Sequence, residues 1–300
     1  MKKFSKNEKN VNLDHAIYYV IPQIFPIKIK KVLEELQQQG IEIMLLDCNF
    51  IKQNRYSHKN NFLLLVDQSR ETLFDLYPEL CPFATDQWNF FSILGDFSTV
   101  DLILNLLLFD VSQLKQRAEP LKRFMEKTKE VRVLGPGTDI TFRIQKNSVT
   151  WDFDGNQYPQ GELGVFAERD SINGMITYNV PILLEDKLYH QVQLFFRHGE
   201  IVENKCEEGV FPLHLQQKFN WKFAFGLHPN ISTPTYSRLD AKMIGSFHFS
   251  PVSATGITVL FPFIQRTDYG DGEIYFDHML IRKDGMFVLS DLLPLNYHLK

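Results

Sequence analysis

The sequence predicts a chain of two domains, with an α/β domain at the N-terminus and a β-rich α+β domain at the C-terminus. Three observations carry this prediction. Short apolar runs alternate with helical patterns up to residue 130, closely spaced strands and turns follow from residue 131, and a polar helical segment, Ser112–Lys129, lies at the change. We therefore place the two domains at residues 1–130 and 131–300.

The first domain has the alternation expected of strands and helices. The predicted strands are Ala16–Ile21, Ile41–Asp47 and Phe62–Val66. A helix is predicted over Ile27–Gln39, where apolar residues recur at helical spacing. The almost wholly apolar stretch Thr99–Phe109 is long enough for a buried helix and too short to span a bilayer. Such alternation favours a small, mostly parallel sheet.

The second domain is dominated by strand patterns with many aromatic residues. The predicted strands are Asp139–Ile144, Met175–Tyr178, Gln191–Arg197, Met243–Ser250, Ile257–Phe263 and Glu273–Ile281. The one helix predicted after residue 131 spans Leu213–Ala224. We therefore expect the C-terminal domain to be mainly β.

Composition and charge exclude several classes of protein. Side chains that are 44% hydrophobic and 13% aromatic can build a core in each domain without disulfides. The 3 cysteines, Cys48, Cys81 and Cys206, are far apart and form no thiolate zinc motif. A net charge of -4 without a basic stripe gives no reason to expect a nucleic-acid partner. The polar N-terminus precedes no apolar segment of membrane-spanning length, so we expect a cytoplasmic protein with no membrane partner.

Five local sequences of the second domain resemble the aminopeptidase T family of metallopeptidases, in the same order and at similar spacing. They are Gly135-Pro-Gly-Thr-Asp-Ile-Thr141, Tyr158-Pro-Gln-Gly-Glu162 with Asp170-Ser-Ile-Asn-Gly174, Phe225-Gly-Leu-His-Pro-Asn230, Lys242-Met-Ile-Gly-Ser-Phe-His248 and Ile274-Tyr-Phe-Asp277. The resemblance implies a C-terminal domain of the aminopeptidase T type, and it implies a homodimer. The N-terminal domain shares only the general α/β texture.

The two-metal chemistry of that family needs several carboxylates and imidazoles around a pair of divalent ions. Carried over by the resemblance, three positions are intact, Glu162, His248 and Asp277. Lys222 falls where the family has a second glutamate, and Tyr275 falls where it has a histidine. An ammonium group cannot bind a cation. The resemblance therefore implies a family member whose metal ligands are altered.

A mononuclear metal site is an alternative on the same scaffold. The dihydroxypyridine ring-cleaving dioxygenases also resemble this domain and hold one ferrous ion through histidine, serine and a terminal His-x-Asp motif. In this sequence Tyr275 replaces the histidine of that motif. By that resemblance, His228 and Ser250 fall near the first two positions, with Asp277 at the last. Two histidines and one carboxylate, His228, His248 and Asp277, would suit a non-haem iron. The sequence therefore leaves open whether a metal is bound. If one is, we expect a single divalent ion, zinc or iron, with ligands among Glu162, His228, His248 and Asp277.

Each candidate also has a structural interpretation. Glu162 can be a solvated carboxylate at a strand end, and His248 a hydrogen-bonded histidine of the core. Asp277 can accept hydrogen bonds from a neighbouring turn, and Lys222 can lie on the polar face of the predicted helix. A buried ion pair of Lys222 with Glu162 could also replace a metal ion.

The function we expect from the sequence is that of a catalytically altered metallo-aminopeptidase-like protein, a pseudoenzyme that binds a peptide. The bound peptide would be a substrate or a precursor, for example in the maturation of a peptide natural product. We expect the cleft to be lined by the ligand positions above, with Lys222, Ser250 and Tyr275 contacting the peptide. A one-metal enzyme, either a dioxygenase or a hydrolase, and a structural or regulatory partner protein are the alternatives.

Overall fold

The computed structural model describes most of the chain after residue 110 and selected segments before it. The described residues are 17–20, 34, 38, 43–45, 62–66, 88–92, 106, 109, 111–154, 157–158, 160–184, 187–212, 219–234, 238–252, 264–266 and 272–296. They divide into two compact units. Unit 1 contains Met1–Val111 and Asp154–Gln160, and unit 2 contains Ser112–Phe153 and Gly161–Lys300.

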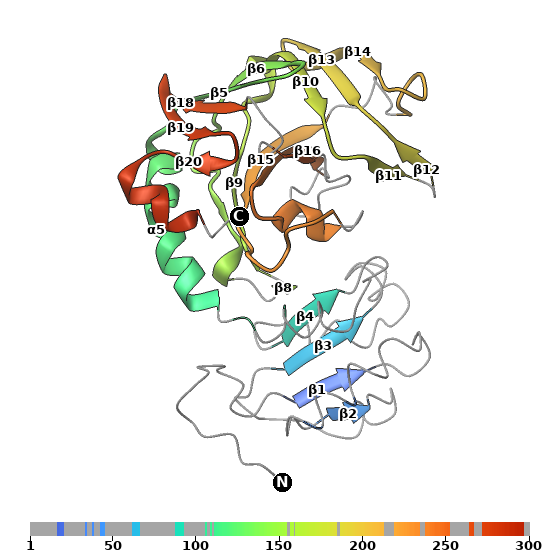
Figure 1. The fold of residues 1–300 in the computed structure, drawn as a ribbon, viewed down its shortest axis with the longest axis vertical. Helices are drawn as coiled ribbons and strands as arrows, with labels where there is room; N and C mark the ends of the chain where they lie inside the picture. Colours follow the sequence, from blue (N-terminus) through green and yellow to red (C-terminus); the bar gives the residue numbers. More distant parts are fainter. Residues whose placement is uncertain are drawn as a thin grey trace. The chain divides into compact units, whose positions relative to one another are not determined.

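Unit 1 contains a parallel sheet of five strands in the order β2-β1-β3-β4-β8 (Figure 1). Its strands are β1 Ile17–Val20, β2 Ile43–Leu45, β3 Phe62–Val66, β4 Trp88–Ser92 and β8 Gln157–Tyr158. Every pairing between them is parallel, and β1, β2 and β3 lie within the three predicted strands. Glu34, Gln38 and Leu106 are helical, as expected, whereas Phe109, the last residue of the second predicted helix, is not. The rest of the two predicted helices lies outside the described residues. The complete α/β arrangement therefore stays a prediction.

Unit 2 begins with the predicted polar helix, α5 Val111–Lys127. Its buried residues Leu114, Ala118, Leu121 and Met125 recur at three- and four-residue intervals, so they form one apolar stripe. This stripe explains why α5 groups with unit 2, whereas the sequence suggested a boundary after the helix, between residues 130 and 131. The division also differs from the prediction at Asp154–Gln160, which groups with unit 1 because β8 pairs with β4.

Unit 2 is built on two antiparallel sheets, a β-rich architecture with few helices. The larger sheet has eight strands in the order β14-β13-β10-β6-β5-β18-β19-β20. They are β5 Glu130–Gly135, β6 Thr138–Arg143, β10 Asn173–Tyr178, β13 Val192–Arg197, β14 Glu200–Lys205, β18 Glu273–Phe276, β19 Met279–Lys283 and β20 Met286–Phe287.

The smaller sheet has five strands in the order β17-β16-β15-β9-β7. They are β7 Thr150–Trp151, β9 Glu162–Phe166, β15 Asn220–Gly226, β16 Ser246–Val252 and β17 Ile264–Arg266. A separate hairpin pairs β11 Ile182–Leu184 with β12 Lys187–Tyr189. Short 3-10 turns lie at Asp152–Asp154, Arg169–Ser171, Arg238–Lys242 and Ser290–Leu295.

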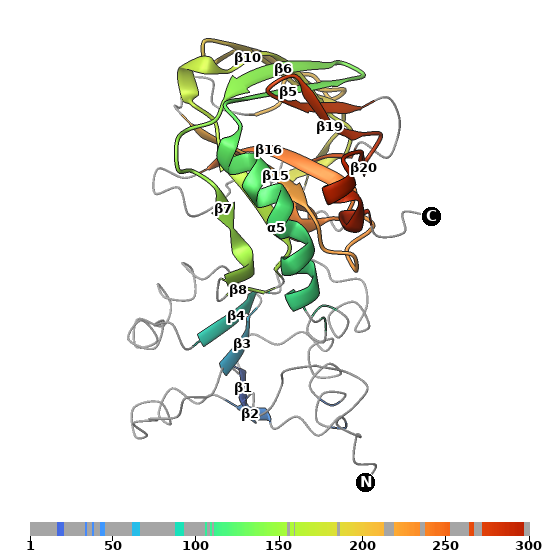
Figure 2. The ribbon, with the colours of Figure 1, turned by 90° about the vertical axis from the view of Figure 1, so that its left-hand side faces the viewer.

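The two sheets of unit 2 pack face to face through aromatic rings, and Figure 2 shows them as two layers. Phe142 of the larger sheet stacks on Phe249 of the smaller one with ring centroids 5.0 Å apart. Phe196 meets Trp221 edge to face at 5.0 Å. Since Phe223 is also fully buried, this layer forms the core of unit 2.

The structure corrects two predicted elements of the second domain. The predicted helix Leu213–Ala224 is wrong in its described part, which is strand β15, because Trp221, Phe223 and Phe225 alternate at the two-residue period of a strand. The predicted strand Glu273–Ile281 is a hairpin of β18 and β19, because Asp277 and His278 turn the chain with φ values of 46° and 70°. The predicted strand Ile257–Phe263 lies outside the described residues.

Candidate functional site

The smaller sheet carries its polar side chains on the face opposite the aromatic core. Directly paired residues of neighbouring strands share a face, and β15 pairs Lys222 with Ser250, Ala224 with His248 and Gly226 with Glu162. Alternation along β15 sends Trp221, Phe223 and Phe225 to the other face. The strand pattern thus brings together Glu162, Lys222, His248 and Ser250, four of the residues that the sequence singled out.

Glu162 and Lys222 form a buried ion pair between Oε1 and Nζ. Lys222 is in register with Phe166, so four residues of β9, about 13 Å, separate it from Glu162 along the strand. The two side chains extend toward each other past Gly164 and Ala224. These positions must stay small, because a Cβ on Gly164 would lie 2.4 Å from the Cβ of Ala224.

His248 is fully buried between Glu162 and Ser250. Its Nδ1 lies 2.9 Å from the hydroxyl oxygen of Ser250, and its Nε2 lies 3.6 Å from Oε2 of Glu162. At that distance Nε2 has no hydrogen-bond partner among the described residues. Burial raises the pKa of Glu162, but the charges of Lys222 and His248 outweigh burial and hold that pKa well below its ordinary value.

A second ion pair joins Lys242 to Asp152 next to the first, and neither residue was predicted as part of the site. Asp152 Oδ2 accepts from Lys242 Nζ, while its Oδ1 accepts from the backbone N of Gly161 at 3.0 Å and of Glu162 at 2.8 Å. Burial lowers the pKa of Lys242, but the attraction of Asp152 and Glu162 outweighs it and raises that pKa. Both pairs together leave the cluster close to neutral.

His228 lies beside this cluster and is buried. Its backbone N donates to the carbonyl of Lys242 at 2.9 Å, and its Nδ1 accepts from the backbone N of Asn230 at 3.2 Å. Gly161 leaves room for it, since a Cβ there would lie 2.9 Å from the Cβ of His228. Burial and the charge of Lys242 lower the pKa of His228 to about 3, so this imidazole is neutral at physiological pH.

Comparison with known proteins agrees with this architecture. Residues 111–216 match the sequence profile of the thermophilic metalloprotease (M29) family, over the segment that contains α5, the larger sheet up to β14, and Glu162. The chain resembles the thermophilic metalloprotease family. No curated protein matches the chain.

Two solved structures have folds similar to that of this chain. AmpT from Thermus thermophilus superimposes with a TM-score of 0.55 at 11% identity, covering 94% of this chain and 95% of that one. The 2,5-dihydroxypyridine dioxygenase from Pseudomonas putida KT2440 superimposes with a TM-score of 0.57 at 13% identity, covering 92% of each chain. At these identities the likeness establishes a shared fold.

Two residues that the metalloprotease resemblance placed in the site lie elsewhere. Tyr275 projects from the outer face of the larger sheet, where its hydroxyl donates to Glu273 Oε2 at 2.6 Å. Asp277 occupies the turn between β18 and β19, where its carboxylate accepts from the backbone N of Lys129 at 3.1 Å and of Glu130 at 2.9 Å. Tyr275 and Asp277 therefore do not join the Glu162 cluster, and the Asp277 carboxylate binds the backbone at the start of β5.

The residues present do not fit the metal ions that the metalloprotease family name implies. Lys222 takes one oxygen of Glu162, and the ammonium groups of Lys222 and Lys242 place positive charge where a cation would bind. The single-metal set His228, His248 and Asp277 is not assembled, because the Asp277 carboxylate is bound to backbone N–H groups.

Proposed function

We propose that this chain is a metallopeptidase-like protein that binds a peptide and no longer hydrolyses it with a metal pair. The observation that carries the proposal is the buried ion pair of Lys222 with Glu162. A protein cation here neutralises the carboxylate that a metal would otherwise need. A metal ion could bind Glu162 only if the ammonium group of Lys222 left this contact. Lys222 would then be a buried charge without its partner, which costs several kcal/mol of free energy.

The polar face can still orient a ligand without a metal. Lys222, Lys242 and His248 supply fixed donors and charges, and a peptide carries both a carboxylate and carbonyl oxygens that such groups recognise. The family name, metalloprotease, supports a peptide as the class of ligand. A precursor peptide of a maturation pathway is the specific partner that we propose.

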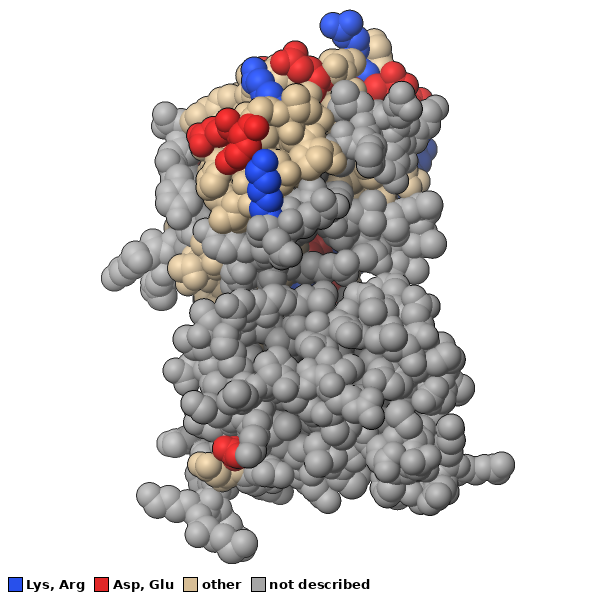
Figure 3. Space-filling view, turned by 90° about the vertical axis from the view of Figure 1, so that its right-hand side faces the viewer, with Lys and Arg blue, Asp and Glu red and all other residues tan. Residues whose placement is uncertain are grey.

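The described surface carries charges of both signs. Acidic and basic side chains are interspersed over the described part of the face in Figure 3, which gives no electrostatic argument for a nucleic-acid partner there. None of the helices in the described part of the chain is both long enough and apolar enough to cross a bilayer.

The experiment that tests the proposal measures hydrolysis and binding in the same samples. Purified protein is incubated with amino-acid amides and with a mixture of random octapeptides, in the presence of zinc, cobalt or manganese. We expect no release of N-terminal residues, because Lys222 stands where the family has a glutamate ligand and occupies the Glu162 carboxylate. We also expect octapeptides to be retained in equilibrium dialysis, equally with and without a chelator.

Two results would contradict this proposal. Metal-dependent release of N-terminal residues that disappears in Glu162→Gln would show that the protein is a metal-dependent aminopeptidase. Octapeptide retention that disappears when a chelator is added would favour a one-metal protein. The matched control is Glu273→Gln, which removes an exposed carboxylate of the larger sheet that hydrogen-bonds only with Tyr275 and Lys283 in the described structure.

A further inference from the structure

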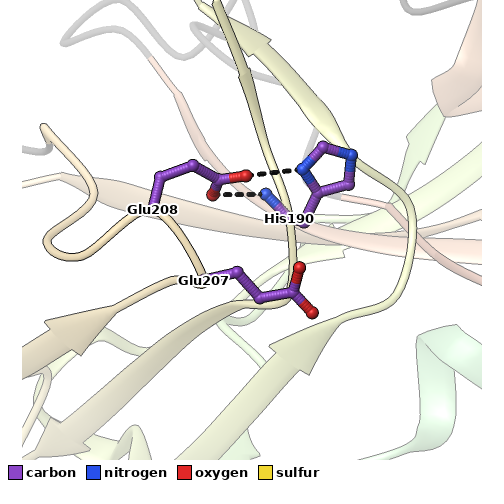
Figure 4. A group of neighbouring side chains, drawn as sticks. All are labelled: His190, Glu207 and Glu208. Carbon is purple, nitrogen blue, oxygen red and sulfur yellow. Dashed lines mark hydrogen bonds and ion pairs between the residues drawn. The ribbon is translucent and has the colours of Figure 1, made fainter.

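A second group of chemically active side chains lies at one end of the larger sheet, apart from the Glu162 cluster. Strand β13 begins and β14 ends there, because the two strands are antiparallel. The group consists of His190, Glu207 and Glu208, whose ligand-type atoms all lie within 4.8 Å of one another (Figure 4). Among the described residues, no other set of three or more His, Cys, Asp or Glu side chains meets this condition.

The backbone fixes the three positions relative to one another. The backbone N of Glu207 donates to the carbonyl of His190 at 3.0 Å. Cys206 and Gly209 close the adjacent turn with two hydrogen bonds of 2.8 Å and 3.1 Å. Only side-chain rotations separate the present arrangement from one in which the ligand atoms converge.

His190 and Glu208 already share a position that an ion could take. Nδ1 of His190 lies 2.6 Å from Oε1 of Glu208, and the backbone N of His190 donates to Oε2 at 2.8 Å. A proton between Nδ1 of His190 and Oε1 of Glu208 is the species that a metal ion would replace, because ligands must be deprotonated to bind a metal.

His190 distinguishes this group from an ordinary acidic surface. Two glutamates alone are common on a surface, whereas an imidazole beside them adds a nitrogen donor of the kind that zinc binds together with carboxylates.

We propose that His190, Glu207 and Glu208 form a binding site for one zinc ion, with a water molecule as the fourth ligand. Tetrahedral zinc holds neighbouring ligand atoms roughly 3.3–3.8 Å apart, so the present separations need only small rotations of exposed side chains. Calcium and magnesium are disfavoured because they bind oxygen ligands almost exclusively. The site is independent of the peptide-binding proposal, since it uses none of the residues of the Glu162 cluster.

Calorimetric titration of zinc into the full chain tests the site. We expect one zinc ion to bind through this group, and His190→Ala and Glu207→Gln each to weaken its binding. The loss should exceed the roughly 10–100-fold that removal of an outer-shell partner causes, because both residues are direct ligands. Glu203→Gln is the matched control, an exposed carboxylate on β14 outside the group, and it should leave the affinity unchanged.

Cys206→Ser is a second control, because the Cys206 sulfur is not among the ligand atoms that lie within 4.8 Å of one another. This variant should leave the zinc affinity unchanged. Zinc binding of equal strength in the wild type and His190→Ala would overturn the site, as would the absence of zinc binding.

Discussion

Lys222→Met is the most informative perturbation of the polar face. Methionine keeps most of the length of the lysine side chain but carries no charge, so Glu162 stays buried and loses its nearest cation. The side chains of Lys222 and Glu162 are 13% and 8% exposed, and water can therefore replace little of the lost attraction. Removing one partner of a buried pair costs about 3–5 kcal/mol. Since His248 and Lys242 still attract Glu162, we expect about 3 kcal/mol.

The double variant Lys222→Met with Glu162→Gln separates the ion pair from general packing. Replacing both partners by neutral side chains of similar size is often close to neutral, so this protein should lose less than about 1 kcal/mol. The coupling energy of the double-mutant cycle should then exceed about 2 kcal/mol. Urea unfolding followed by tryptophan fluorescence measures both quantities.

The pH dependence provides a second measurement of the same pair. Because the folded-state pKa of Glu162 is lowered, its contribution to stability is present above the ordinary carboxyl value of 4.5 and is lost as pH falls below that value. Without the charge of Lys222, less opposes the effect of burial, so the pKa of Glu162 is higher than in the wild type and Glu162 takes up its proton at a higher pH. The stability gap between wild type and Lys222→Met should therefore narrow toward low pH. A gap below about 0.5 kcal/mol at pH 7 would refute the buried ion pair, since surface changes alone have effects of that size.

Two further predictions concern residues that the sequence placed in the site. Asp277→Ala should lower the free energy of unfolding by about 1–3 kcal/mol, because Asp277 accepts hydrogen bonds from the backbone N of Lys129 and Glu130. Octapeptide binding should stay unchanged, and a selective loss of binding in equilibrium dialysis would contradict this prediction. His228 should stay neutral from pH 7 down to about pH 4, because its pKa is lowered to about 3, and folding stability should fall between about pH 6.5 and pH 3 as only the unfolded chain takes up this proton. NMR titration of the imidazole protons checks the second prediction, and a midpoint near 6.5 for His228 would count against it.

Local patterns predicted much of the fold because they depend on neighbours in the chain. The polar helix was placed almost residue for residue, and Phe62–Val66 matches β3. The predicted helix over Leu213–Ala224 is wrong from Asn220 onward, because Trp221 and Phe223 alternate with Lys222 and Ala224 at the two-residue period of a strand. The hairpin at Asp277 was missed because neither Asp277 nor His278 is a glycine, although both have positive φ.

The candidate site was predictable only where strand register could be inferred. Glu162, Lys222, His248 and Ser250 meet because β9, β15 and β16 are neighbours, and each lay in a recognisable segment. Asp152 lies in a short 3-10 turn and Lys242 at the end of another, and no periodic pattern marks the position of such residues. Tyr275 and Asp277 were misplaced because sequence order does not say which sheet a strand joins.

The assignment of Asp154–Gln160 to unit 1 has a consequence for how the protein is made and cut. Strand β8 lies in this short segment and pairs with β4 at the edge of the parallel sheet of unit 1. The main segment of unit 1 ends at Val111, so about fifty more residues must be synthesised before β8 can join the sheet. During translation, the side of β4 that pairs with β8 therefore stays without its partner strand while α5, β5 and β6 are synthesised. A truncation after Val111 would leave β4 unpaired on that side, and one that begins at Ser112 would keep β8 without its sheet. The two units are thus interleaved in sequence.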